Sequence, residues 1–101
     1  MKLSMLSEML ESPRDNELFR QIGLGLGELY LVATGYTPDE VWLELIDNLE
    51  KLAYGIQDDG DKLQRRDKRI LLQQIINAKN TNDYGYSIRN ISRSVMRLKK
   101  Q

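Results

Sequence analysis

Apolar residues recur at the three- and four-residue spacing of an α-helix along every long segment of this 101-residue chain. No segment alternates apolar and polar residues cleanly enough to predict a β-strand. The pattern therefore predicts an all-α fold, a compact bundle of four to five helices. A chain of this length is large enough for one hydrophobic core and too short for two. We therefore expect residues 1–101 to form a single helical domain.

Proline and capping residues set the predicted boundaries of the first two helices. A helix over residues 2–11 ends before Pro13, because the residue that precedes a proline is disfavoured in the helical region. A second helix begins at Asp15 or Asn16, either of which can cap it, and runs to about Thr34. Its inward face is predicted to hold Leu18, Phe19, Ile22, Leu26, Leu29, Tyr30 and Ala33.

The segment from residue 35 to residue 40 carries the strongest boundary signals. Gly35 is expected to end the second helix in the left-handed conformation. Thr37 then starts a capping box, with Pro38 at the first helical position and Glu40 three residues after the cap. The third helix runs from there to about Tyr54, with Gly55 closing it. Its core positions are Val41, Trp42, Leu45, Ile46, Leu49, Leu52 and Ala53.

The remaining chain predicts two further helices. Residues 57–60 form a turn, and a fourth helix spans about residues 61–79. A polar loop over residues 80–85 separates it from the last helix, which begins at Ser87 and runs to near the C-terminus.

The formal net charge of zero conceals a strong polarisation along the chain. Residues 37–60 carry one lysine and seven acids, whereas residues 61–101 carry eleven bases and three acids. Such an asymmetry produces an electric field that steers charged partners.

The last helix is predicted to separate its charge and its apolar residues most completely. At 100° per residue one side holds Ile88, Ile91, Val95 and Leu98, and the opposite side holds Arg89, Arg93, Arg97 and Lys100. Arginines on one face can bind phosphates or carboxylates in bidentate fashion, and they can equally be a solvated face near a helix C-terminus.

The fourth helix shows a similar division. Its basic stripe consists of Lys62, Arg65, Arg66 and Arg69, and its inward stripe of Leu63, Ile70, Leu71, Ile75 and Ala78. Leu72 and Ile76 continue the basic stripe. A surface that passes from arginine to large aliphatic side chains is typical of a protein contact, unless another helix of the chain covers them.

Two other patterns are better explained by a structural role than by a metal site or a nucleotide-binding motif. The acids Glu40, Glu44 and Asp47, with Glu50 nearby, form a solvated acidic face, since a metal site in a helical bundle usually recruits histidine and the chain has none. Three glycines at positions 23, 25 and 27 lack the preceding strand of a nucleotide-binding motif. Gly23 and Gly27 lie four residues apart, so they predict the close approach of another backbone along one side of the helix, with a kink or break of the helix as the alternative.

Composition argues against several classes of function. The chain has neither histidine nor cysteine, which removes the usual bases and nucleophiles of catalysis, so we expect no enzyme activity and no cofactor. No run approaches the length of a membrane span, and the acids Glu8 and Glu11 interrupt the start of a signal-like segment. The expected location is the cytoplasm.

The favoured prediction is a small regulatory or adaptor protein, such as an inhibitor or accessory factor, that binds a larger protein. The basic faces of the last two helices, together with Leu72 and Ile76, would form the partner-binding surface. A first alternative is direct binding of nucleic acid by the same bases, although a helix-turn-helix motif does not fit their spacing. A second alternative is a structural homo-oligomer, and we expect a homodimer whose apolar centre comes from these helices.

Overall fold

The computed structural model describes residues 13–100, with side chains from residue 17 onward. This part of the chain forms the helices α2 (Pro13–Ala33), α3 (Trp42–Tyr54), α4 (Lys62–Asn77) and α5 (Tyr84–Lys99), with 3-10 turns η1 (Asp39–Val41) and η2 (Ala78–Asn80). Residues 13–100 contain no β-strand, which confirms the all-α prediction and a bundle of four helices within this range. The helix predicted over residues 2–11 lies outside the described residues.

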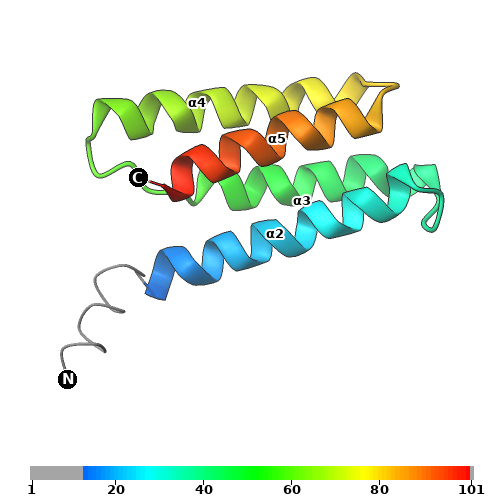
Figure 1. Cartoon of the computed structure of the whole chain (residues 1–101), viewed down its shortest axis with the longest axis horizontal. Coiled ribbons are helices and arrows are strands. Elements are labelled where there is room, and N and C mark those ends of the chain that lie inside the picture. Colours follow the sequence, from blue (N-terminus) through cyan, green and yellow to red (C-terminus); the bar gives the residue numbers. More distant parts are fainter. Residues whose placement is uncertain (1–12, 101) are drawn as a thin grey trace.

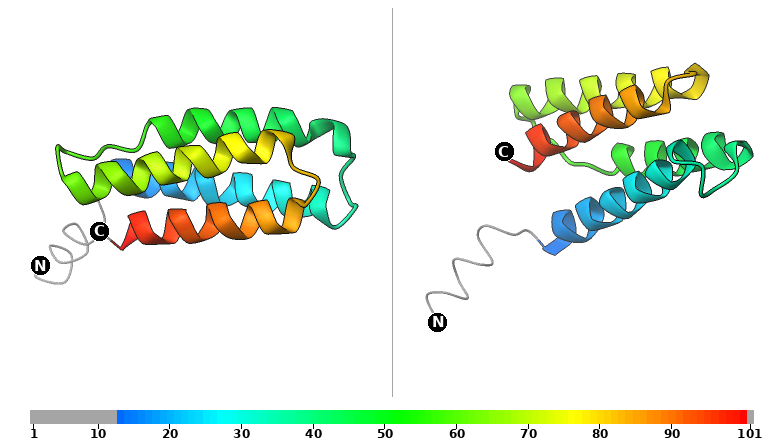
Figure 2. Two further views of the ribbon diagram at one scale, coloured as in Figure 1. Left: turned by 90° about the horizontal axis from the view of Figure 1, so that it is seen from above. Right: turned by 45° about the vertical axis from the view of Figure 1, so that its right-hand side comes forward.

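The helices run alternately up and down, so each is antiparallel to the next one in the chain (Figure 1). Contacts join α2 to α3, α3 to α4, α4 to α5 and α5 back to α2, so the helices form a ring. Short connections between antiparallel neighbours produce this topology. As a consequence α3 and α5 occupy opposite corners of the bundle (Figure 2).

The core sits on the axis of this ring and draws on every helix. Its buried apolar residues are Ile22, Leu29, Val32, Trp42, Ile46, Leu49, Ala53, Ile56, Leu71, Ile75, Ala78, Ile91, Val95 and Leu98. The predicted core of the third helix is confirmed, with Val41, Leu45 and Leu52 partly buried against it.

Three residues predicted to face inward are exposed instead. Tyr30 and Ala33 of α2 face solvent, and Val32 is buried in their place. The core side of α2 follows Ile22 and Leu29, and at 100° per residue Tyr30 falls on the flank of that line. Leu63 is exposed because it lies in the first turn of α4, to one side of the line through the buried residues of that helix.

The start of α2 differs from the prediction, and its end agrees with it. The helix begins at Pro13, so Asp15 and Asn16 lie inside it and the predicted start at one of these residues is wrong. A proline fits the first turn because its missing N–H would have no partner there. At the other end Gly35 has a φ of +86°, and the amides of Gly35 and Tyr36 donate to the carbonyl oxygens of Val32 (3.1 Å) and Leu31 (2.9 Å). This is a Schellman motif.

The predicted capping box before the third helix is wrong. The amide of Thr37 donates to the carbonyl of Leu31 at 3.1 Å, so Thr37 completes the end of α2 and does not cap the next helix. The helical path restarts in η1, where the amide of Val41 donates to the carbonyl of Pro38 at 3.3 Å. The last helix also starts earlier than predicted, at Tyr84, because the side chain of Asp83 accepts a hydrogen bond from the amide of Tyr86 at 3.0 Å.

Trp42 joins three elements at one end of the bundle. Its side chain is buried at the start of α3, and its indole Nε1 donates to the carbonyl oxygen of Ala78 in η2 at 2.7 Å. The ring stacks on Tyr84, the first residue of α5, with centroids 4.0 Å apart and planes inclined by 16°. One side chain therefore satisfies a buried carbonyl at the end of α4 and positions the start of α5.

The Trp42→Phe variant tests this anchor. It keeps an aromatic ring near Tyr84 but leaves the buried carbonyl of Ala78 without its donor, so we expect the free energy of unfolding to fall by about 1–3 kcal/mol. Tyr84→Phe is the matched control, since it retains the ring and should change the stability by less than about 0.5 kcal/mol. Urea unfolding followed by circular dichroism measures both, and equal stabilities for the two variants would contradict the role of the hydrogen bond.

One substitution should have opposite effects at two glycines. A Cβ at Gly27 meets nothing within 4 Å inside α2, so Gly27→Ala should raise the free energy of unfolding by about 1 kcal/mol. Gly35→Ala should lower it by about 1–2 kcal/mol, because its left-handed backbone disfavours a side chain. Thermal unfolding at low protein concentration checks the two signs, and a shared sign would refute the assignment.

Candidate binding surface

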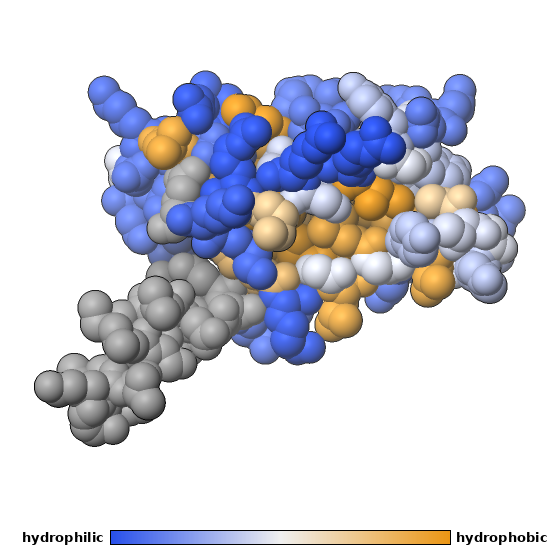
Figure 3. Space-filling view, viewed as in Figure 1, coloured by the Kyte–Doolittle hydropathy of each residue, from blue (hydrophilic) through white to orange (hydrophobic). Residues whose placement is uncertain are grey.

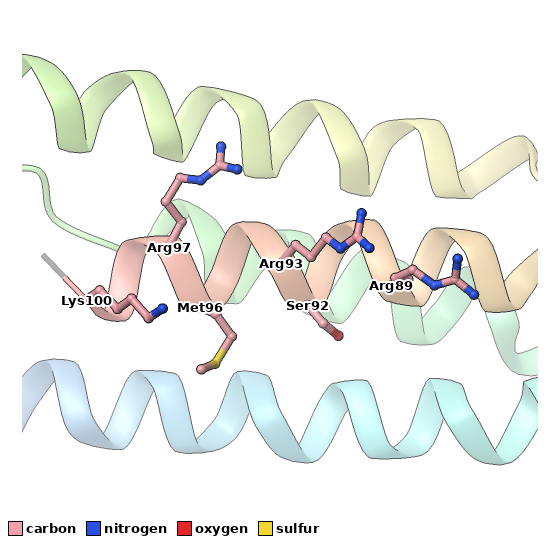
Figure 4. A pocket seen from close by; sticks show the side chains of 6 residues that line it. All are labelled: Arg89, Ser92, Arg93, Met96, Arg97 and Lys100. Carbon is pink, nitrogen blue, oxygen red and sulfur yellow. The ribbon is translucent and has the colours of Figure 1, made fainter.

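The outer face of α5 presents four basic residues in a row, which we call the basic face of α5: Arg89, Arg93, Arg97 and Lys100. All four are exposed, and the buried residues Ile91 and Leu98 lie on the opposite side of the helix. They line one open hollow together with Ser92 and Met96 (Figure 4). The side chains of Arg89, Arg93 and Arg97 point toward α4, while those of Ser92 and Met96 point toward α2. The arrangement predicted from the sequence is therefore present.

The basic stripe of α4 is exposed as well, but acids offset part of its charge. Arg65 Nε lies 3.7 Å from Asp58 Oδ2, and Arg66 Nη2 lies 3.3 Å from Asp67 Oδ1. Lys62 and Arg69 complete this exposed stripe. In contrast, neither the basic face of α5 nor the adjacent Lys99 forms an ion pair among residues 17–100, whose side chains the structure describes. The uncompensated positive charge of the described chain is therefore greatest along α5.

Leu72 and Ile76 differ from each other in their environment. Leu72 is half-buried and packs against the core, so the prediction that it lies outside the core is wrong. The physical reason is that α3 and α5 flank α4 on both sides and cover its edges. Ile76 remains 40% exposed. The apolar continuation of the basic stripe on α4 is thus reduced to one isoleucine.

Asp67 is a buried acid that the sequence interpretation missed. Its exposed fraction is 2%, and it contacts the guanidinium of Arg66. The signal was present in the spacing, because Asp67 lies four residues before the buried Leu71 and therefore falls on the inward side of α4. A carboxylate is stable at such a position only with partners.

The acidic face of α3 is partly neutralised inside the chain. Lys79 of η2 places its Nζ 2.9 Å from Glu50 Oε1 and 3.6 Å from Asp47 Oδ1. The hydrogen bond to Glu50 raises the pKa of Lys79 above its ordinary value, and the charges of Glu50 and Asp47 act in the same direction. Glu40 and Glu44 are exposed and form no ion pair with any side chain that the structure describes.

The loop between α3 and α4 uses its acids for local structure. Asp58 Oδ1 accepts a hydrogen bond from the amide of Gly60 at 3.0 Å, which lowers the pKa of the Asp58 carboxyl, and the charges of Arg65 and Lys68 lower it further. Asp61 caps α4 by accepting from the amide of Gln64 at 2.9 Å. In the part of the chain that the structure describes, no group of three or more His, Cys, Asp or Glu side chains could hold a metal ion.

The three glycines of α2 neither form a nucleotide loop nor break the helix, because α2 is continuous from Pro13 to Ala33. A Cβ at Gly25 would lie 3.5 Å from Leu49 Cδ1, so this glycine faces α3. A Cβ at Gly23 or Gly27 would meet nothing within 4 Å. The prediction that these two glycines receive another backbone is not met within residues 13–100.

Comparison with protein-family models, with curated proteins and with solved structures gives no match for this chain. Between residues 13 and 100 no helix is long and apolar enough to cross a membrane.

The contact of Lys79 with Glu50 predicts a pH-dependent stability. A raised lysine pKa stabilises the fold while the lysine is charged, and this contribution is lost as the pH rises through the pKa of the folded state. Lys79→Gln should therefore lower the unfolding temperature at neutral pH, and its difference from the unaltered chain should shrink above the ordinary lysine pKa of 10.5. Lys51→Gln is the control, because Lys51 is exposed and forms no ion pair with any described residue. A difference that persists at high pH would contradict this account.

Proposed function

We propose that this chain is a small non-enzymatic regulatory or adaptor protein that binds an acidic surface of a larger protein through the basic face of α5. The observation that carries the proposal is the row of four exposed cations without ion pairs in the described chain. An inhibitor or accessory factor acts through contacts of this kind. The absence of histidine and cysteine from the sequence supports a role in binding and not in catalysis.

The side chains around the cations favour a protein partner. Tyr86 and Met96, both more than half exposed, lie on the same helix as the arginines. Arginine, tyrosine and methionine are the residue types enriched at protein interfaces, where they combine apolar area with hydrogen bonding. The space-filling view shows strongly hydrophilic side chains over α5 directly above an apolar band toward α2 (Figure 3). A surface that binds only phosphate groups gains no affinity from such apolar neighbours.

The position of the acids supports steering of the partner. α3 and α5 lie on opposite corners of the bundle (Figure 2), and the acids Glu44 and Asp47 of α3 are exposed at a distance from the basic face of α5. The molecule thus carries a dipole across its width, which orients it as it approaches an acidic surface.

The same geometry keeps nucleic-acid binding as a second candidate function. Acids on the corner opposite α5 do not face a ligand bound there, so they do not oppose the approach of a nucleic acid to α5. α4 and α5 run side by side in both views and do not cross as in a helix-turn-helix (Figures 1 and 2), so any such binding would use the exposed cations alone.

A pair of matched charge reversals tests the proposal. Arg89→Glu with Arg93→Glu alters α5, and Lys62→Glu with Arg69→Glu makes the same change in charge on α4. We expect the α5 variant to lose a partner that the unaltered chain captures from native lysate, with nuclease present, and the α4 variant to retain it. Loss of the partner at higher salt would follow from the ionic contacts.

Titration with duplex and single-stranded DNA separates the two candidates. At about 150 mM salt we expect little binding if the partner is a protein. Tight binding that disappears in the α5 variant would favour the nucleic-acid function instead. In that case the logarithm of the binding constant should fall linearly with the logarithm of the salt concentration. Equal capture by both variants would refute a role for α5.

A further inference from the structure

The outer face of α2 is apolar although it is exposed to solvent. Leu24, Tyr30 and Leu31 are 57%, 60% and 44% exposed. From residue 21 to residue 36 the only charged residue is Glu28, and apolar and polar residues are separated less in α2 than in any other α-helix of residues 13–100. Apolar side chains also project along the lower edge of the molecule, where α2 lies (Figure 3). A helix that is apolar on both sides packs on both sides.

The exposed residues follow a spacing that pairs helices. Arg20, Leu24, Gly27 and Leu31 are separated by four, three and four residues, the spacing of coiled-coil a and d positions. They lie on the side of α2 that is opposite to the buried Ile22 and Leu29. The exposed residues therefore form a second stripe, distinct from the one that enters the core.

Gly27 in this stripe and Gly23 next to it have no packing partner among the described residues that explains a glycine there. Gly23 and Gly27 are in mid-helix, where glycine is unfavourable, and nothing in residues 13–100 approaches their Cβ positions within 4 Å. On such a surface the leucine side chains protrude, and the glycines next to them leave shallow recesses of matching size.

We infer that α2 is a self-association surface and that its occupant is a second copy of this chain, antiparallel to the first. With a two-fold axis between Leu24 and Gly27, the leucine of each copy lies on the glycine of the other. In the same register Tyr30 of each copy lies level with Gln21 of the other, within one helical turn of Gly23. Large side chains then fill the recesses of an identical surface, as an isologous contact requires.

The charges of α2 select the antiparallel arrangement. Arg20 and Glu28 lie on the two sides of the proposed axis, and both are exposed. In an antiparallel pair the arginine of each copy comes within one helical turn of the glutamate of the other. A parallel pair would set like charges side by side. Arg20 also binds Glu17 of its own helix at 2.6 Å, a contact on the exposed side that does not prevent a second one.

The α4 surface is the weaker candidate for self-association. Leu72 is half-buried against the core of its own chain, which leaves Ile76 as the exposed aliphatic residue of the two. We therefore place the apolar centre of the homodimer in α2, and the basic face of α5 remains available for another partner.

Sedimentation velocity over micromolar to near-millimolar protein tests the inference. A contact of two helices is small, so the mass should rise from 11.8 kDa toward twice that value within this range. Leu24→Glu and Leu31→Glu should each stay at 11.8 kDa throughout while retaining helical circular dichroism. Leu63→Glu is the matched control, an exposed leucine on α4 that should leave the association unchanged.

Two further variants complete the test. The double variant Gly23→Ala with Gly27→Ala should fold with a higher melting temperature as a monomer, yet raise the dissociation constant at least about tenfold, because each copy adds two methyl groups to the contact. A monomeric unaltered chain would overturn the inference. So would a dimer that Ile76→Glu dissociates and Leu24→Glu does not, or one that the double alanine variant leaves equally tight.

Discussion

The hydrogen bond from Trp42 to the carbonyl of Ala78, with the stack of its ring on Tyr84, is the contact on which the arrangement of the bundle depends. It joins the start of α3, the end of α4 and the start of α5 in a buried place. A buried carbonyl must find a donor, and the indole supplies one without adding a charge to the core. The turn between α4 and α5 is thereby held in a fixed position, and so is the direction in which α5 leaves it.

The direction of α5 decides how the surfaces divide their roles. With the helices in a ring, α3 and α5 occupy opposite corners, and the acids of one cannot neutralise the bases of the other. Lys79 binds Glu50 and Asp47, but no described acid reaches the basic face of α5. α2 keeps an apolar outer stripe with a single charge after Arg20. Each of three corners thus has its own chemistry: acidic, basic and apolar.

Much of the fold and of the candidate surface was predictable, because helical spacing assigns each residue an angle. The inward residues of α3 and α5 and the outward arginines followed from that angle. Predictions failed where a neighbouring element decided the outcome. Leu72 is half-buried because α3 and α5 flank α4, and the amide of Thr37 bonds to Leu31 because α2 ends in a Schellman motif. The burial of Asp67 was not predicted, because an acid is expected at the surface although its position in the helix lies on the inward side.

The sequence by itself determined the helical class, the third and fifth helices with their apolar sides, and the unequal distribution of charge along the chain. These properties depend on local spacing and composition, which do not change with the way the helices are arranged. Only the tertiary structure decided which charges meet, that Gly23 and Gly27 face outward with open space, and that α3 lies opposite α5. Spacing gives the angle of a residue around its own helix, whereas exposure depends on where the other helices stand around that axis.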